Sequence, residues 1–154
     1  MTLFSPFTCR GLHLGNRIVM APMTREYAPG GVPTAAMAEY YARRARGGTA
    51  LLIAEGAPPN AAGNFGAAVP RLYGREVVDA WASVTGAVRS AGGAMLAQLW
   101  HVGAFDPSLI GMQDSLSGVE RLSPSGLAAP GRAYGRAMTE AEIESTVAGY
   151  AAAA

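Results

Sequence analysis

The chain has 154 residues, of which 50% are hydrophobic and 15% are charged, and its formal net charge at pH 7 is +1. This composition is typical of a globular domain with a single core, and the near-zero charge disfavours binding to nucleic acid or to an anionic membrane. All twelve basic residues are arginine and Cys9 is the only cysteine, which excludes a Schiff-base lysine and an internal disulfide within this chain.

The first 17 residues are predicted to form a short hairpin, because small hydrophobic pieces alternate there with Pro6, Gly11 and Gly15. The start of the chain has neither a basic segment nor a long hydrophobic stretch, so we expect no signal peptide. Every hydrophobic run in the chain is too short to cross a bilayer. These features together predict a cytoplasmic protein that does not bind a membrane.

Three hydrophobic runs are predicted to form buried strands, at residues 18–21, 49–54 and 94–99. They are hydrophobic throughout instead of alternating with polar residues, which indicates strands of a parallel sheet that is covered on both faces. Between the runs, hydrophobic residues recur at spacings of three and four over residues 34–46 and 77–88. This spacing predicts two helices, and a pair of glycines follows each of them.

The last third of the chain is predicted to be a long irregular loop followed by a helix. Residues 103–137 are rich in Gly, Ser and Pro, and their acidic residues lack the spacing of metal ligands, so no metal site is expected. Thr139 and Glu142 match the capping box that begins a helix at about residue 140. The α/β order, without a dinucleotide fingerprint or a nucleophile elbow, favours a (β/α) barrel over a Rossmann domain or an α/β-hydrolase.

The third hydrophobic run contains a primary amide, Gln98, and leads into Trp100 and His101. A buried amide costs roughly 1–3 kcal/mol unless it is paired, so we expect Gln98 to have a specific partner. The other two runs also change from hydrophobic to polar or small residues where they end, at 22–25 and 55–56. Barrel enzymes carry their chemistry at the carboxyl ends of the strands, so these three strand ends are candidates for a common site.

Seven segments follow one another along the chain: LFSPF (3–7), NRIVMAPMTR (16–25), MAEYYARRA (37–45), EGA (55–57), QLWHVG (98–103), SPS (123–125) and MTEAEI (138–143). Together they resemble the Old Yellow Enzyme family of FMN-dependent oxidoreductases, and the resemblance covers essentially the whole chain. It implies the N-terminal part of a (β/α)8 TIM barrel, with about three of the eight strands present. Residues 1–17 would be the N-terminal hairpin and residues 18–154 the first βα units and a long loop, with no second domain.

The resemblance implies that FMN lies across the carboxyl end of the barrel. By their positions in the motifs, the residues that face FMN would be Pro22, Met23, Thr24, Gly56 and Gln98. The carboxamide of Gln98 would pair with the pyrimidine ring of the flavin, because an amide complements the N–H donor and carbonyl acceptors of that ring. Trp100 and His101 would lie on the substrate side, and neither is assigned a catalytic role.

The resemblance also implies an NAD(P)H:flavin oxidoreductase, or ene-reductase, that takes hydride from NAD(P)H onto FMN and passes it to an activated alkene. The alkene would be an α,β-unsaturated carbonyl or nitro compound, so the expected partners are small-molecule substrates. The proton donor and the substrate-anchoring pair are expected beyond residue 154, so the catalytic residues are unknown and the chain is expected to be incomplete and inactive alone. Two alternatives remain open: a dienoyl-CoA-type reductase of the same family and a non-catalytic barrel fragment. A homo-oligomer of the full-length protein also remains open.

Two positions depart from the family pattern on the substrate side. Ala104 stands where relatives usually have arginine, and Asn64-Phe65-Gly66 stands where many have a tyrosine. We therefore expect the substrate preference, but not FMN binding, to be affected. Arg25 and Glu55 are charged residues at predicted strand ends that are interpreted as pairing with each other, and no role is assigned to them.

Overall fold

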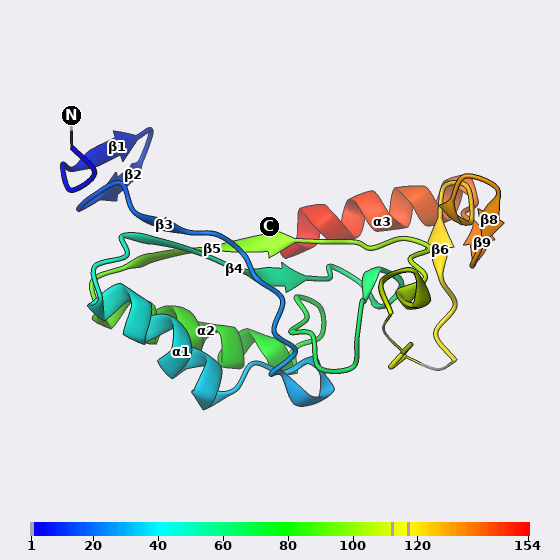
Figure 1. Ribbon diagram of the computed structural model, residues 1–154, viewed down its shortest axis with the longest axis horizontal. Helices are drawn as coiled ribbons and strands as arrows, with labels where there is room; N and C mark the ends of the chain where they lie inside the picture. Colours follow the sequence, from blue (N-terminus) through cyan, green and yellow to red (C-terminus); the bar gives the residue numbers. More distant parts are fainter. Residues whose placement is uncertain (1, 112, 117) are drawn as a thin grey trace.

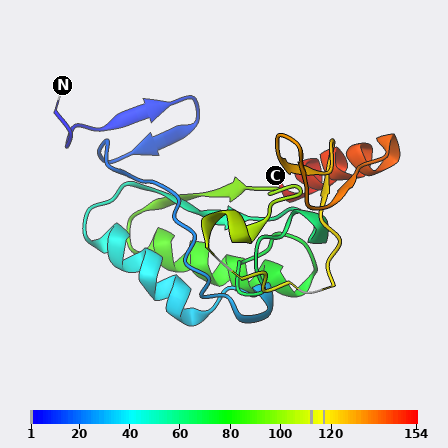
Figure 2. The same ribbon diagram turned by 45° about the vertical axis from the view of Figure 1, so that its right-hand side comes forward.

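The computed structural model describes residues 2–111, 113–116 and 118–154. The elements that build its centre are β3 (Val19–Met20), α1 (Ala35–Arg46), β4 (Leu51–Ala57), α2 (Glu76–Ser90) and β5 (Ala94–Leu99). The three strands form a parallel sheet in the order β3-β4-β5 (Figure 1). The two helices connect the strands and pack on one face of the sheet (Figures 1 and 2). The strand and helix order predicted from the sequence is confirmed.

Helix α1 begins and ends where its local sequence predicts. Thr34 caps it, because its side-chain oxygen accepts a hydrogen bond from the backbone N–H of Met37 at 3.3 Å. The last turn carries three arginines, whose positive charge is favourable near the negative end of the helix dipole, and Gly47 follows directly. These are short-range effects, which is why the sequence alone locates the helix.

The main core lies between the sheet and the two helices. Its centre is Leu52, a fully buried residue near the start of β4, and Met20 and Met95 flank it on the neighbouring strands. The buried members of this core are Ala28, Met37, Tyr41, Ala45, Leu52, Val84 and Val88. Side chains from all three strands and both helices therefore meet in one layer.

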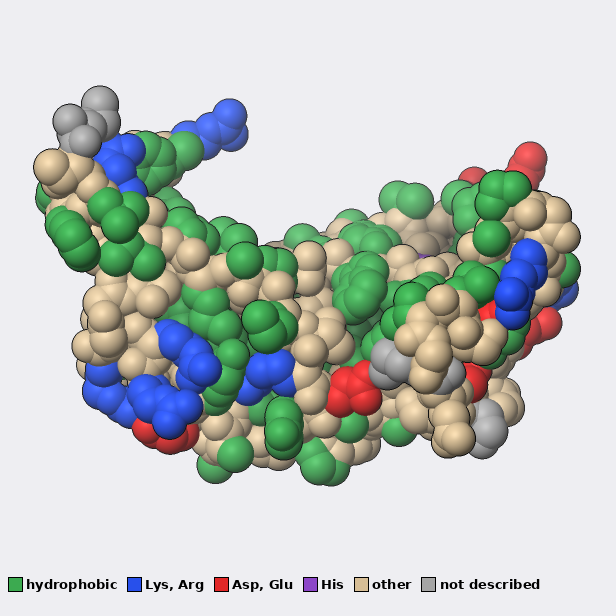
Figure 3. All heavy atoms as spheres, viewed as in Figure 1, with side chains coloured by type: hydrophobic (Ala, Val, Ile, Leu, Met, Phe, Trp, Pro, Cys, Tyr) green, Lys and Arg blue, Asp and Glu red, His purple; other side chains and the backbone are tan. Residues whose placement is uncertain are grey.

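The opposite face of the sheet is open in the part of the chain that the structure describes. Every residue of β4 except Ile53 is buried, but the side chains of Val19 in β3 and Leu96 in β5 are 47% and 49% exposed. The prediction that all three strands are covered on both faces is therefore wrong for β3 and β5. The reason is that α1 and α2 cover one face only. Figure 3 shows the molecule hollowed along this side, between its two ends.

The predicted N-terminal hairpin is present as β1 (Phe7–Cys9) and β2 (Leu12–Leu14), which pair antiparallel. The buried Leu14 packs with Ala50 and Leu51 at the start of β4. The hairpin therefore lies at the amino end of the parallel sheet, away from the strand ends that carry the candidate site (Figure 1).

The connecting segments contain more structure than the sequence predicts. They include the short helices η1 (Pro29–Gly31), η2 (Ala61–Gly63) and η3 (Pro107–Ile110), and the strands β6 (Leu122–Ser123), β7 (Leu127–Ala129), β8 (Arg132–Ala133) and β9 (Arg136–Ala137). Strand β6 pairs parallel with β9, and β7 pairs antiparallel with β8. Strands of two or three residues are too short to show a hydrophobic period, so the prediction of an irregular loop missed them.

The predicted capping box is confirmed at the start of α3 (Glu140–Ala153). The Thr139 hydroxyl accepts from the Glu142 backbone N–H at 3.3 Å, and the Glu142 carboxylate accepts from the Thr139 N–H at 2.8 Å. Arg136 joins this cap, since it pairs with Glu142 at 2.7 Å and with Glu120 at 2.9 Å. None of the helices formed by the described residues is both long enough and hydrophobic enough to cross a membrane.

We expect the start of α3 to loosen in acid. Hydrogen bonds from Arg136 and from the Thr139 backbone lower the pKa of Glu142 from 4.5 to about 2. A carboxylate with a lowered pKa stabilises the folded state above its unfolded pKa and loses this effect as pH falls towards its folded pKa. Protection of the amides in the first turn, measured relative to the intrinsic exchange rate at each pH, should therefore decrease as the pH falls from about 4.5 to 2. Glu142→Gln should abolish this pH dependence, whereas Glu144→Gln on the same helix should leave it unchanged.

Candidate functional site

The carboxyl ends of β4 and β5 lie side by side at one edge of the sheet, and the chain that follows β3 runs to the same edge. Gly56 in β4 is opposite Gln98 in β5 in the strand register. The chain that follows β3 reaches β4 at Glu55, whose carboxylate accepts a hydrogen bond from the backbone N–H of Arg25 at 3.1 Å. The three strand ends that the sequence singled out are therefore brought together.

Two polar side chains at this edge have no partner within the chain. The carboxamide of Gln98 and the hydroxyl of Thr24 are half-buried, and neither forms a hydrogen bond with any residue that the structure describes. Within the same described residues, the backbone N–H groups of Met23 and Thr24 are also unpaired. Neither side chain is among the described residues with a fully buried, unpaired side-chain polar atom, so this edge presents accessible donors and acceptors to a polar ligand.

Gly56 lies directly against the indole ring of Trp100. A Cβ added at Gly56 would be 1.9 Å from Cε3 of Trp100, which is far inside the contact distance of two carbon atoms. A residue without a side chain is therefore needed at position 56 so that the indole of Trp100 can pack against β4. The resemblance predicted that Gly56 lets the backbone approach FMN, and that role remains a prediction beside the observed one.

An aromatic cluster extends from Trp100 beyond the end of β5. The ring of Phe65 stacks on Trp100 with centroids 5.7 Å apart, and it contacts Phe105 at 5.4 Å. A cavity of about 340 Å³ is lined by Phe65, Trp100, His101, Val102, Phe105 and Ile110. Phe65 belongs to one of the two segments that depart from the family pattern. It lines the same cavity as Trp100 and His101, the two residues predicted to lie on the substrate side.

His101 is held at the same end by its neighbours in the loop. Its Nδ1 accepts a hydrogen bond from the backbone N–H of Gly103 at 3.1 Å, so the neutral ring carries its proton on Nε2. Nε2 is buried and has no hydrogen-bond partner among the described residues. Burial lowers the pKa of His101 below its usual 6.5, which favours the neutral ring. His101 is therefore a buried donor close to Trp100.

A buried ion pair connects the end of β3 with β4 and α1. Glu55 is fully buried, and its Oε1 accepts from the Arg25 guanidinium at 2.8 Å and from the Tyr41 hydroxyl at 3.3 Å. The Tyr41 hydroxyl in turn accepts from the Glu55 backbone N–H at 3.1 Å. Burial raises the pKa of Tyr41, which keeps its hydroxyl protonated as a donor. The expected Arg25–Glu55 pair is confirmed, and Tyr41 is the member that sequence reasoning missed.

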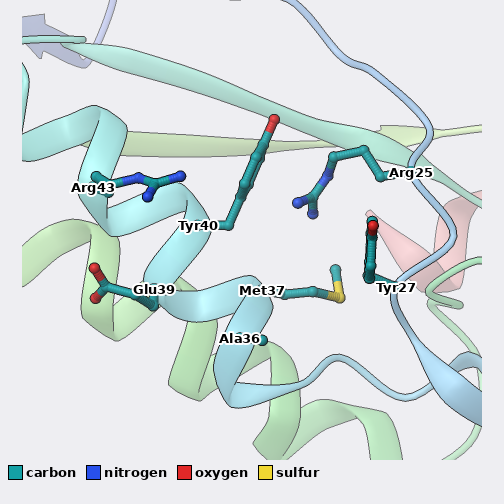
Figure 4. Close-up of a pocket in the computed structure, with 7 residues that line it drawn as sticks. All are labelled: Arg25, Tyr27, Ala36, Met37, Glu39, Tyr40 and Arg43. Carbon is teal, nitrogen blue, oxygen red and sulfur yellow. The ribbon is translucent and has the colours of Figure 1, made fainter.

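The side chain of Arg25 is also held by an aromatic ring (Figure 4). Its guanidinium carbon lies 3.4 Å from the ring centroid of Tyr40, and that of Arg44 lies 3.3 Å from the same centroid. Two groups this close to one centroid must lie on opposite faces of the ring, so Tyr40 is held between two cations. Beside them is a cavity of about 450 Å³ lined by Arg25, Tyr27, Ala36, Met37, Glu39, Tyr40 and Arg43.

The family model described as NADH:flavin oxidoreductase / NADH oxidase family matches residues 2–154. The chain belongs to this family, the Old Yellow Enzyme family. Members are FMN-dependent oxidoreductases that use NAD(P)H as the reductant.

Named relatives share substantial identity with this Old Yellow Enzyme chain. It is 50% identical over 101 residues to 12-oxophytodienoate reductase 7 of Oryza sativa subsp. japonica, which is 66% of this chain and 25% of the relative. It is 38% identical over 155 residues to chanoclavine-I aldehyde reductase fgaOx3 of Penicillium roqueforti, which is 99% of this chain and 41% of the relative. The chain thus spans less than half of the length of either reductase.

Solved structures of the family show the same arrangement. The old yellow enzyme homologue from Zymomonas mobilis superposes with a TM-score of 0.83 at 36% identity, over 100% of this chain and 44% of that protein. Morphinone reductase superposes with a TM-score of 0.84 at 29% identity, over 98% of this chain and 43% of that protein. These relatives are TIM barrels, so β3, β4 and β5 are the first parallel strands of an Old Yellow Enzyme barrel. In the described residues the sheet does not close.

The residues at the carboxyl edge fit the FMN that the family uses. FMN presents carbonyl acceptors and one N–H donor in its pyrimidine ring, and the unpaired Gln98 carboxamide supplies the complementary groups. The unpaired Thr24 hydroxyl and backbone N–H are donors in the segment after β3, which lies on the other side of β4 from Gln98. Pro22 and Met23 have no polar side-chain group whose pairing could be compared with FMN, and the side chain of Met23 is 64% exposed. Their contacts with FMN therefore remain predictions.

Proposed function

We propose that the protein carrying this chain reduces activated alkenes, namely α,β-unsaturated carbonyl or nitro compounds, with NAD(P)H as the hydride source and FMN as the cofactor. Family membership supports the cofactor and the reductant. The relatives are named as reductases of oxophytodienoate, chanoclavine-I aldehyde and morphinone, which supports small organic substrates.

The observation that carries the proposal is the unpaired carboxamide of Gln98 at the carboxyl edge of the sheet. Bound FMN supplies the hydride transfer. Gln98 binds and orients the pyrimidine ring, while Thr24 donates a hydrogen bond that favours negative charge on the ring. Trp100 and Phe65 provide an apolar wall, and we propose that His101 lies with them on the substrate side.

The test is a Gln98→Leu variant of the full-length protein, with Gln113→Leu as the control because Gln113 is the other, exposed glutamine. Loss of two hydrogen bonds at about 0.5–1.5 kcal/mol each predicts a rise of about 10–100-fold in the Kd for FMN. The thermal stability of the FMN-free protein should stay the same or rise, because the amide has no protein partner to lose.

Flavin absorbance during purification and NAD(P)H oxidation with 2-cyclohexen-1-one or a nitroalkene measure the proposed activity directly. A colourless full-length protein that FMN does not stabilise would overturn the proposal. Equal FMN affinity in Gln98→Leu and Gln113→Leu would instead show that Gln98 does not face the cofactor.

A further inference from the structure

The buried carboxylate of Glu55 is attached to two of the three strand ends at once. One oxygen, Oε2, accepts the backbone N–H of Arg25, and the other, Oε1, accepts the Arg25 guanidinium. The N–H of Arg25 belongs to the peptide that joins it to Thr24, so this bond holds the plane of that peptide. Glu55 itself directly precedes Gly56 in β4.

A bulge in β4 accompanies this arrangement. Between the paired positions Ile53–Leu96 and Gly56–Gln98, β4 advances three residues while β5 advances two. The extra residue changes the side-chain alternation immediately before Gly56, and β-bulges of this kind re-aim side chains beside functional sites. Glu55 lies within the bulge, and its fully buried side chain reaches the segment that follows β3.

The remaining partners make the carboxylate rigid. Tyr41 donates to Oε1 and accepts from the Glu55 backbone N–H, so α1 holds both ends of this residue. Tyr40 lies against the guanidinium of Arg25, which fixes the counter-ion. By contrast, the donors of Thr24 have no other attachment among the described residues. The hydrogen bond from the Arg25 backbone N–H to Glu55 therefore holds the backbone directly after Thr24.

We propose that Glu55 is a positioning residue for FMN chemistry: its carboxylate fixes the Thr24–Arg25 peptide so that the Thr24 hydroxyl stays aimed at the cofactor. This inference rests on the proposed function, since it gives Glu55 a role only if Thr24 faces FMN. A purely structural ion pair would stabilise the fold without affecting the cofactor.

The first test compares Thr24→Ala, Glu55→Gln and the double variant of the full-length FMN-loaded protein. In the wild-type chain the two donors of Arg25 use different oxygens of Glu55, and a glutamine replaces one of these oxygens by an NH2 group that cannot accept. Each single variant should weaken binding of the reduced relative to the oxidised cofactor by about tenfold, which lowers the two-electron midpoint potential by about 30 mV. The double variant should show no further decrease, because both changes remove the same interaction.

Glu39→Gln is the matched control, because it makes the same chemical change in an exposed ion pair of α1 with Arg46. It should leave the potential unchanged. If Thr24→Ala lowers the potential and Glu55→Gln adds an equal and independent decrease, the positioning role is wrong while the proposed function stands. If Thr24→Ala changes neither FMN affinity nor potential, the proposed FMN contact of Thr24 is itself wrong.

The second test needs no variant and is made on the FMN-free protein by amide hydrogen exchange. The Arg25 amide should exchange at least about 100-fold more slowly than the Thr24 amide, because only the former is bonded to a buried carboxylate. Exchange of the Arg25 amide at the rate of an unstructured peptide would overturn the proposal. This measurement is possible even if Glu55→Gln fails to fold, because it uses the unaltered protein.

Discussion

Arg25→Met is expected to lower the free energy of unfolding by about 3–5 kcal/mol, as does the removal of one partner from a buried ion pair in general. The reason is that the side chain of Glu55 is 0% exposed and would lose its counter-ion, which leaves a buried acidic group without its main partner. The Arg25 side chain is itself 12% exposed, so water cannot readily replace it. Chemical denaturation of the full-length protein, in parallel with the unaltered form, measures the loss.

The control for Arg25 is Arg46→Met, which removes the cation from the exposed pair with Glu39. An exposed pair contributes about 0–1 kcal/mol, so this variant should be nearly neutral. Combining Arg25→Met with Glu55→Met should recover most of the lost stability, because the unpaired charge is gone. Equal losses in Arg25→Met and Arg46→Met would contradict the buried position of this ion pair.

Gly56→Ala is expected to lower the free energy of unfolding by about 1–3 kcal/mol, which is the usual cost of overpacking a tight contact. The added methyl would lie 1.9 Å from Cε3 and 2.8 Å from Cδ2 of Trp100, so the indole must move. Because Trp100 stacks on Phe65, the displacement should also change the near-ultraviolet circular dichroism of the aromatic cluster.

Gly86→Ala in α2 is the same substitution with the opposite expected sign. A Cβ at Gly86 meets no atom within 4 Å, and alanine is favoured over glycine in a helix by about 0.5–1 kcal/mol. In thermal unfolding, the midpoint temperature of Gly86→Ala should therefore be higher than that of the unaltered protein, and the midpoint temperature of Gly56→Ala should be lower. A Gly56→Ala variant as stable as the unaltered protein would show that Trp100 does not pack against β4 in solution.

Both predictions concern contacts that no pattern in the sequence shows directly. Arg25 and Glu55 were recognised as a candidate pair because opposite charges follow neighbouring strands. Their partner Tyr41 was assigned only to a helix face, since hydrophobic spacing describes where a side chain lies and not which polar atom it meets. Likewise, the resemblance explains Gly56 by an approach of FMN, which stays a prediction, and it does not show the contact with the indole of Trp100 that the structure adds.

The helix boundaries could be predicted because the interactions that set them are local. Thr34 and Thr139 each bond to a backbone N–H three residues away, so the capping residue and the helix are adjacent in the sequence. The central strand was also predictable, since a continuous hydrophobic run such as residues 51–54 has few alternatives to burial. The resemblance of the motifs to one family then indicated which barrel these elements belong to.

Three-dimensional packing was needed to decide how the strand ends meet. The bulge before Gly56 sets which residue of β4 lies opposite Gln98, and a shift of one residue would reverse the direction of every following side chain. The exposure of β3 and β5 likewise depends on which faces the helices cover. These features arise from contacts between residues far apart in the chain, such as Arg25 with Glu55, and local chemistry along the chain does not encode them.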